Sequence, residues 1–307
     1  MQIVNPSFTI QDDLDRQSIA VRLEACGRVC YKSEDKITEE SAIPFVTKIT
    51  GHGHNSVLEM AVATLRITCG IDHRQALYQC QPKYLQIDEI ATGLLVTGSI
   101  RAFRELYRQH ADLAIISDSV GYLAAKYPYL FADIITADAR RKDELIAISK
   151  LSLAEVEKLP PDLVLRHRFV GVKFIVNRAV THELVRHRPC SFLQESQRYC
   201  RYSHAKFGNQ LTFIRPIFYA EDSVEFELWR QAMAETERLY LLLLATSTPQ
   251  AARTVLPNSC KTEIIAYCNL AEWKHIFILR TSPAAEPSMR EVMLPLQAEM
   301  QKRYPFC

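Results

Sequence analysis

The stretch FVGVKFIVNRAVTHELVRHRPCSFLQESQRYCRYS, residues 169–203, carries most of what the sequence predicts about the fold. Its first residues, Phe169 to Val176, form a β-branched apolar run that is typical of a buried strand. We expect a helix from about Asn177 to His187, because Pro189 disfavours helical geometry at Arg188. Residues 190–203 should then leave as an extended loop. The helix end and this loop hold arginines at positions 186, 188, 198 and 201, so an anion site is expected there.

Bulk composition narrows the class of protein. The chain has 307 residues, with 37 basic and 35 acidic side chains and a net charge of +2. This length predicts one large domain or two small ones, and the balanced charge argues against nucleic acid or an anionic membrane as a partner. The longest notable apolar stretch, Leu239 to Ala245, is too short to cross a bilayer, and residues 1–30 do not resemble a secretory signal. We therefore expect a cytoplasmic protein, whose nine cysteines are reduced.

The rest of the chain divides into recognisable segments. A helix is expected over residues 13–31, followed by the turn-rich GHGHNS (residues 51–56) and then by either a strand or a helix-to-strand step at residues 58–70. Residues 74–161 read as a mostly helical insertion within a single domain of residues 1–307. Two further helices are expected over residues 223–245 and 259–279. These patterns predict an α+β fold.

Two motifs resemble catalytic signatures without meeting their geometry. The stretch HELVRH suggests the zinc motif HExxH, but its histidines, His182 and His187, lie five residues apart and so on different helix faces. We therefore expect no metal. Cys190 follows a proline in an arginine-rich stretch, but no base partner is visible, which favours a half-buried loop cysteine over a nucleophile. The sequence has no GxGxxG or Walker A pattern, so a nucleotide would have to be held by side chains.

The tripeptide RHR occurs twice, at residues 166–168 and 186–188, so the tripeptide alone says little. The first copy leads directly into an apolar strand. The second lies at a helix end, where cations suit the carbonyl dipole, and Ser196 follows its last arginine by eight residues. The surroundings therefore favour the second copy as the functional one.

The second copy, RHR followed by seven residues and a serine, resembles the signature of the flavin-dependent thymidylate synthases. Three further blocks resemble that family in the same order: GHGHNSVLEM (residues 51–60), ARTVLP (residues 252–257) and CNLAEWKHIFILR (residues 268–280). The resemblance implies an α+β fold with a mixed sheet flanked by long helices. It implies reductive methylation of dUMP to dTMP, with methylenetetrahydrofolate as carbon donor and NADPH as reductant through FAD. It also implies a homotetramer with its sites at subunit contacts.

Site roles follow from matching positions in that family. The resemblance gives catalytic roles to Arg280, which would favour the N3-deprotonated uracil, and to Ser196 at the pyrimidine. It places around dUMP the residues Glu183, Leu184, Val185, Arg186, Gln194, Glu195, Ser196, Gln197, Arg198, Arg253 and Arg280. It places around FAD the residues His54, Ser56, Arg186, His187, Arg188, Gln194, Asn269 and His275.

Simpler interpretations exist for several of these residues. Arg280 would suit a helix C-terminus, Ser196 would suit a loop that satisfies backbone groups, and His52 and His54 would suit a turn. Arg201, Tyr202 and Tyr219 are interpreted as loop anchors.

Three positions depart from the family pattern. Ala271 replaces an arginine that reaches FAD, Glu286 replaces a histidine, and Met60 replaces the histidine of LEH. These departures predict weaker FAD binding, unless a neighbouring lysine such as Lys274 compensates. They leave an inactive or weakly active homologue that binds nucleotide or flavin as the alternative, and an RNA-binding loop as a more distant one.

Overall fold

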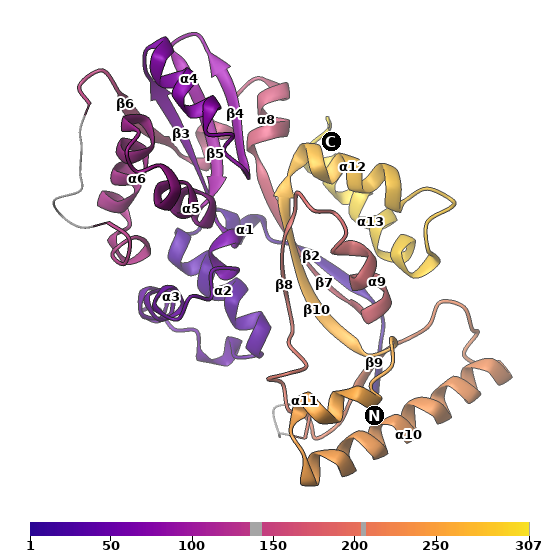
Figure 1. The fold of residues 1–307 in the computed structure, drawn as a ribbon. Helices are drawn as coiled ribbons and strands as arrows, with labels where there is room; N and C mark the ends of the chain where they lie inside the picture. Colours follow the sequence, from indigo (N-terminus) through magenta and orange to yellow (C-terminus); the bar gives the residue numbers. More distant parts are fainter. Residues whose placement is uncertain (136–142, 204–206, 307) are drawn as a thin grey trace.

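A four-stranded antiparallel sheet runs through the middle of the computed structural model, which describes residues 1–135, 143–203 and 207–306 (Figure 1). Its strands, in spatial order, are β2 (Ser7–Ile10), β7 (Phe169–Asn177), β10 (Lys261–Asn269) and β8 (Ser191–Gln194). The β7 strand confirms the expected buried run. The β10 strand pairs with both β7 and β8, which leaves β8 with one neighbour and makes it an edge of the sheet.

Each face of this sheet is covered by a different group of helices (Figure 1). On one face, Val172 and Phe174 of β7 pack with Trp273 and Met293, in a core built on α12 (Leu270–Arg280) and α13 (Pro287–Arg303). On the other face, Leu193 and Ile265 join a core that includes α2 (Ile19–Tyr31). Successive residues of β8 and β10 therefore point to different helical layers.

A second antiparallel sheet has the strand order β4 (Leu85–Ile90), β5 (Gly93–Ser99), β3 (Val62–Thr68) and β6 (Ala147–Leu151). It is packed with α4 (Ile71–Gln79), α5 (Ile100–His110) and α6 (Ala114–Lys126) (Figure 1). The expectation of a mostly helical segment at 74–161 therefore missed three strands, which pair with one another and with β3. Short strands between strongly periodic helices give a weak local signal, because their pairing is long-range. Residues 136–142 of that segment lie outside the described residues.

The strands also correct the expected mixed sheet. Both four-stranded sheets are antiparallel, and the parallel pairing in the described part of the chain joins β1 (Gln2–Val4) to β9 (Thr212–Ile214). The α+β class is confirmed. The direction of the strands was not predictable, because one central strand was not recognised as a strand at all.

That strand is β10, which occupies most of the region expected to be a helix over residues 259–279. Its residues 262–268 are all buried, since the sheet is covered on both faces. The apolar run within it, residues 264–268, has no alternation of polar and apolar residues, so periodicity alone does not distinguish it from a buried helix. The helix α12 begins only at Leu270, with Asn269 as its N-cap.

Other helix boundaries shift for local reasons. The region 13–31 is divided into α1 (Asp12–Asp15) and α2, because Ser18 caps α2 by accepting a hydrogen bond from the Val21 amide. The helix α9 (Arg178–Leu184) ends before His187, whose amide donates to the Leu184 carbonyl three residues back in a tightened turn. The predicted helix over 223–245 is confirmed as α10 (Val224–Thr246).

The remaining helices in the described residues are short. They are α3 (Ala42–Gly51), α7 (Leu153–Val156), α8 (Pro161–His167), α11 (Pro249–Ala252), and the 3-10 turns η1 (Glu34–Lys36), η2 (Val57–Met60), η3 (Pro128–Leu130) and η6 (Arg253–Val255). The η2 turn followed by β3 confirms the helix-to-strand step expected after GHGHNS. A search of the described helices for one long and apolar enough to cross a bilayer finds none.

Candidate active site

The two RHR copies have different environments. In the first copy, Arg168 is fully buried and its guanidinium contacts Asp12, Asp15 and Glu157 at 2.8 to 3.1 Å. His167 lies between the Thr97 hydroxyl and Asp88. The remaining residue, Arg166, pairs with Asp88 and Asp162. All three side chains are therefore used to hold the fold together.

In the second copy both arginines are exposed, and within the described residues the side chains of Arg186 and Arg188 have no hydrogen bond or ion pair. The same is true of Arg253, which lies half-buried in η6. Arg198 has no described carboxylate partner, and its guanidinium lies 5.6 Å from the ring centre of Tyr199. Arginines without a protein counter-ion are suited to bind an anionic ligand.

Arg280 joins the end of α12 to the end of α9. Its Nε donates to Nε2 of His187 at 3.0 Å, and its terminal nitrogens donate to the Glu183 carboxylate at 2.7 Å and to the Glu183 carbonyl at 3.2 Å. The structure thus brings Glu183 and Arg280, which the resemblance placed around dUMP, into contact with His187, which it placed around FAD. A guanidinium has five N–H donors, so Arg280 keeps two for a ligand.

His187 is held in its neutral form. Burial, together with the nearby Arg280 and His275, lowers the pKa of His187 to about 4. Because Nε2 accepts from Arg280, the ring proton lies on Nδ1, which faces Glu272 at 3.6 Å. His275 is exposed on α12, with its ring centre 6.1 Å from that of His187.

Glu272, His187 and His275 could offer ligand atoms within 4.8 Å of one another, the one such group in the described residues. The His187 nitrogen that faces Glu272 is Nδ1, so a metal held by this group would need the Nδ1 lone pair. Because Nε2 accepts from Arg280, Nδ1 carries the ring proton and has no free lone pair. The arrangement therefore fits a neutral hydrogen-bonding histidine better than a metal ligand. His182, from the HELVRH stretch, is exposed and is not part of this group.

The loop residues divide between the two faces of the sheet. The Gln194 side chain donates to the hydroxyls of Thr181 in α9 and Thr262 in β10. Two residues later, the Ser196 amide donates to the Cys30 carbonyl in α2. Gln194 therefore lies toward the Arg280 side, and Ser196 lies toward α2. The extended loop expected from residue 190 begins as the short strand β8.

The GHGHNS turn lies beside the Ser196 side of the loop. His54 is exposed, and its Nδ1 lies 3.1 Å from the hydroxyl of Tyr31. The ring of Tyr31 packs on that of Tyr199, with centres 5.4 Å apart. His52 donates its Nδ1–H to the Lys48 carbonyl at 2.7 Å, as a turn histidine would, and Ser56 is exposed. His54 and Ser56 are thus available to a ligand next to the 196–199 loop.

Other predicted residues have more restricted access. Leu184 is fully buried, so only its backbone could touch a ligand, whereas Val185 is exposed and Gln197 is half-buried. Asn269 already uses both ends of its amide, since its oxygen caps α12 and its nitrogen donates to the Arg166 carbonyl. Arg201 anchors the loop by donating to the Leu244 carbonyl at 2.7 Å.

The three departures from the family pattern lie in different environments. Met60 is fully buried in the core and lines no described cavity. Glu286 caps α13, because its carboxylate accepts from the Met289 amide at 2.8 Å. Ala271 lies half-buried in the first turn of α12. Lys274, which was considered as a compensating cation, is exposed and lies 3.5 Å from the Phe306 carbonyl.

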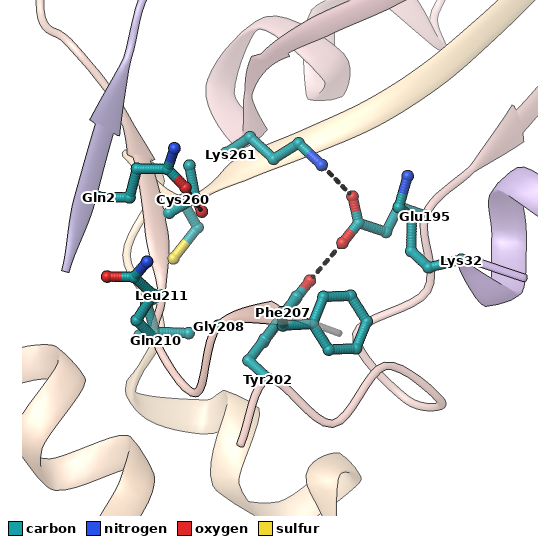
Figure 2. Close-up of a pocket in the computed structure, with 11 residues that line it drawn as sticks. Gln2, Lys32, Glu195, Tyr202, Phe207, Gly208, Gln210, Leu211, Cys260 and Lys261 are labelled. Atoms are coloured by element: carbon teal, nitrogen blue, oxygen red, sulfur yellow. Dashed lines mark hydrogen bonds and ion pairs between the residues drawn. The ribbon is translucent and has the colours of Figure 1, made fainter. Parts of the chain in front are cut away.

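A cavity of about 360 Å³ opens beside Glu195 (Figure 2). Glu195 is 2% exposed, and its two oxygens accept from the Tyr202 hydroxyl at 2.8 Å and from Lys261 at 2.9 Å. Lys261 also donates to Glu263 at 2.7 Å, and Glu263 accepts from Lys32 at 2.9 Å. Burial alone would raise the pKa of Glu263, but the two lysines lower it to about 2.

Sequence patterns did not single out Tyr31, Lys261, Glu263 or Glu272. Each meets its partner through tertiary contacts, so spacing along the chain gave no signal for the pairing. For Glu272 a spacing signal did exist, because it lies three residues before His275 and so on the same helix face.

The fold and these contacts define a candidate nucleotide-binding site with unpaired arginines around a neutral histidine. The chain belongs to the family described as thymidylate synthase complementing protein, whose model matches residues 16–79 and 136–306. A protein of Pyrococcus furiosus named flavin-dependent thymidylate synthase is 40% identical over 128 residues, which cover 41% of this chain and 52% of the relative. One of Corynebacterium glutamicum with the same name is 31% identical over 146 residues, covering 42% and 56%. The chain spans about half the length of the curated relatives it matches.

Proposed function

We propose that this protein is a flavin-dependent thymidylate synthase that methylates dUMP reductively to dTMP. The observation that carries the proposal is the difference between the two RHR copies. Every side chain of the first copy is paired with a carboxylate of the protein, whereas Arg186 and Arg188 of the second are exposed and have no described protein partner. Unpaired arginines on either side of His187, which Arg280 contacts, suit the phosphates of dUMP and FAD. Membership of the family supports the same reaction.

The residues present fit FAD as the cofactor. Exposed, unpaired Arg186 and Arg188 offer planar forks for a diphosphate. Bound FAD would supply the hydride chemistry that couples oxidation of NADPH to reduction of the methylene group from methylenetetrahydrofolate. The chain itself orients the two nucleotides. From the resemblance to the family, we also expect His54, Ser56, Asn269 and His275 to contact FAD.

Arg280 stabilises negative charge on the uracil. The two N–H donors that Glu183 and His187 leave unused would face a carbonyl oxygen and a deprotonated N3. A fixed cation in a partly desolvated site favours the anionic form of the base, which is the form that attacks an electrophilic carbon. Ser196, whose amide is held by α2, would contact the pyrimidine rather than act as a nucleophile.

We propose that the complete site forms between subunits of a homotetramer in the cytoplasm. Two sets of residues expected around dUMP lie toward different faces of the sheet, with Glu183 and Arg280 on the α9 and α12 side and Ser196 on the α2 side. Within the described residues, no hydrogen bond or ion pair joins the two sets. A second copy of the chain would supply the missing set.

The test is release of tritium from 5-tritiated dUMP by the purified protein loaded with FAD. We expect release that requires both NADPH and methylenetetrahydrofolate. Absence of release with FAD bound would refute the proposal. Binding of dUMP or FAD without any turnover would instead identify an inactive or weakly active homologue.

A further inference from the structure

The bridge at Glu195 closes the loop that carries Ser196, Gln197 and Arg198. Glu195 donates its amide to the Glu263 carbonyl and so belongs to the sheet, whereas the next amide is bonded to α2. Its carboxylate is bonded to Tyr202, seven residues further along the same loop. The hydrogen bond thus ties the two ends of the loop together across the three predicted substrate residues.

Lys261 anchors this bridge to the rigid part of the fold. It is the first residue of β10, the strand with two paired neighbours, and its ammonium donates to Glu195 (Figure 2). The same ammonium also donates to Glu263. Glu263 in turn accepts from Lys32, which ends α2 in a left-handed conformation with φ of 48°. The chain of contacts therefore links the loop to β10 and to α2.

Packing alone does not hold the loop here, because the cavity of about 360 Å³ lies against Tyr202, Glu195 and Lys261 (Figure 2). A side chain with empty space on one side can turn into that space, unless directional bonds prevent it. Glu195 itself is 2% exposed and has both oxygens occupied, so it is poorly placed to touch a nucleotide.

We propose that Tyr202 and Lys261 are positioning residues for dUMP binding, which act through Glu195 by holding the 196–198 loop in its binding conformation. This inference rests on the proposed function, since it takes dUMP as the ligand of that loop. Glu195 then has an indirect role, in place of the direct contact that the resemblance implied.

The first experiment compares Tyr202→Phe with Tyr240→Phe in the FAD-loaded protein. Tyr202→Phe keeps the ring that packs on Phe207 and removes only the hydroxyl bonded to Glu195. The Tyr240 ring lies 5.9 Å from that of Tyr202, and its buried hydroxyl faces the Tyr202 backbone and does not bond Glu195. Tyr240→Phe therefore controls for loss of a tyrosine hydroxyl at this loop without loss of the bond to Glu195. Loss of a hydrogen bond to a charged group should weaken dUMP binding by about 10-fold or more.

We expect Tyr202→Phe to raise the Kd and KM for dUMP while kcat at saturation and FAD affinity stay close to wild type, with Tyr240→Phe unchanged throughout. A merely structural role would lower FAD affinity and dUMP affinity together. Unchanged dUMP affinity in Tyr202→Phe, or an equal loss in both variants, would overturn the inference. Failure of the wild-type protein to bind dUMP would refute the proposed function instead.

Lys261 provides an independent pair of variants. Lys261→Met removes the cation that bridges Glu195 and Glu263, whereas Lys261→Arg keeps it. We expect the methionine variant to lose dUMP affinity by more than Tyr202→Phe, and the arginine variant to recover most of it. Equal dUMP affinity in the two Lys261 variants would contradict a positioning role for the charge.

Discussion

Replacing Arg188 and Arg168 by alanine, one at a time, separates a ligand-binding arginine from a structural one within the same tripeptide. Arg168 is fully buried among Asp12, Asp15 and Glu157. Breaking a buried ion network by removing one partner costs about 3–5 kcal/mol, because uncompensated charge stays inside. For a chain of this size, that is a fall in Tm on the order of 10 °C.

Arg188 is exposed and has no described partner, so Arg188→Ala should change the free energy of unfolding by no more than about 0.5 kcal/mol. If Arg188 binds a phosphate of FAD, loss of one charge-assisted hydrogen bond costs about 1.5–3 kcal/mol, or about 10- to 100-fold in Kd.

The assay is thermal unfolding of the apoprotein at fixed concentration, with flavin fluorescence titration of each variant. We expect Arg168→Ala to lose stability and Arg188→Ala to lose FAD affinity. The reasoning would be refuted by unchanged FAD affinity in Arg188→Ala, or by equal losses of Tm in both variants.

Three further outcomes are expected. Arg280→Ala should abolish tritium release from dUMP while FAD stays bound, as its visible spectrum would show; retained turnover would remove the proposed role at N3. The folded-state pKa of His187 is about 4, below the usual value of 6.5, so the unfolded chain binds this proton more readily. Stability should therefore fall as the pH drops from about 6.5 to about 4, and His187→Gln should flatten that part of the profile of Tm against pH. Glu286→Ala should cost about 1 kcal/mol through loss of the α13 cap, with FAD affinity unchanged; a tighter complex with FAD would instead show that this carboxylate repels phosphate.

The sequence predicted the parts of the fold whose signals are local. The β7 run, the helix after it and the long helix α10 each have a distinct composition and a capping residue, Asn177 or Ser223, at the start of the helix. The strand β10 was taken for a helix, because burial on both faces removes the alternation that identifies a strand. The other three strands of the second sheet, β4, β5 and β6, were missed because neighbouring helical patterns were stronger, whereas β3 was anticipated.

The candidate site was predictable in its motif residues but not in their supporting contacts. The position of Arg186 and Arg188 at a helix end followed from Pro189 and the spacing to Ser196. The ion network that occupies Arg168, by contrast, joins residues more than 150 positions apart, such as Asp12 and Asp15. A bridge such as Lys261 to Glu195 depends on which strands pair, and strand pairing was the part of the fold that sequence patterns described least well.

The edge position of β8 makes the site sensitive to chain length. Four residues paired with β10 set its register, and no described strand lies on its other side. A shift by one residue would send Gln194 toward α2 and Glu195 toward α9, which exchanges their environments. Insertions between Arg188 and Ser191 that only lengthen the turn would leave the pairing of β8 with β10 unchanged. An insertion of one residue within β8 would exchange the environments of Gln194 and Glu195. Function therefore depends on the number of residues in β8 as well as on their identity.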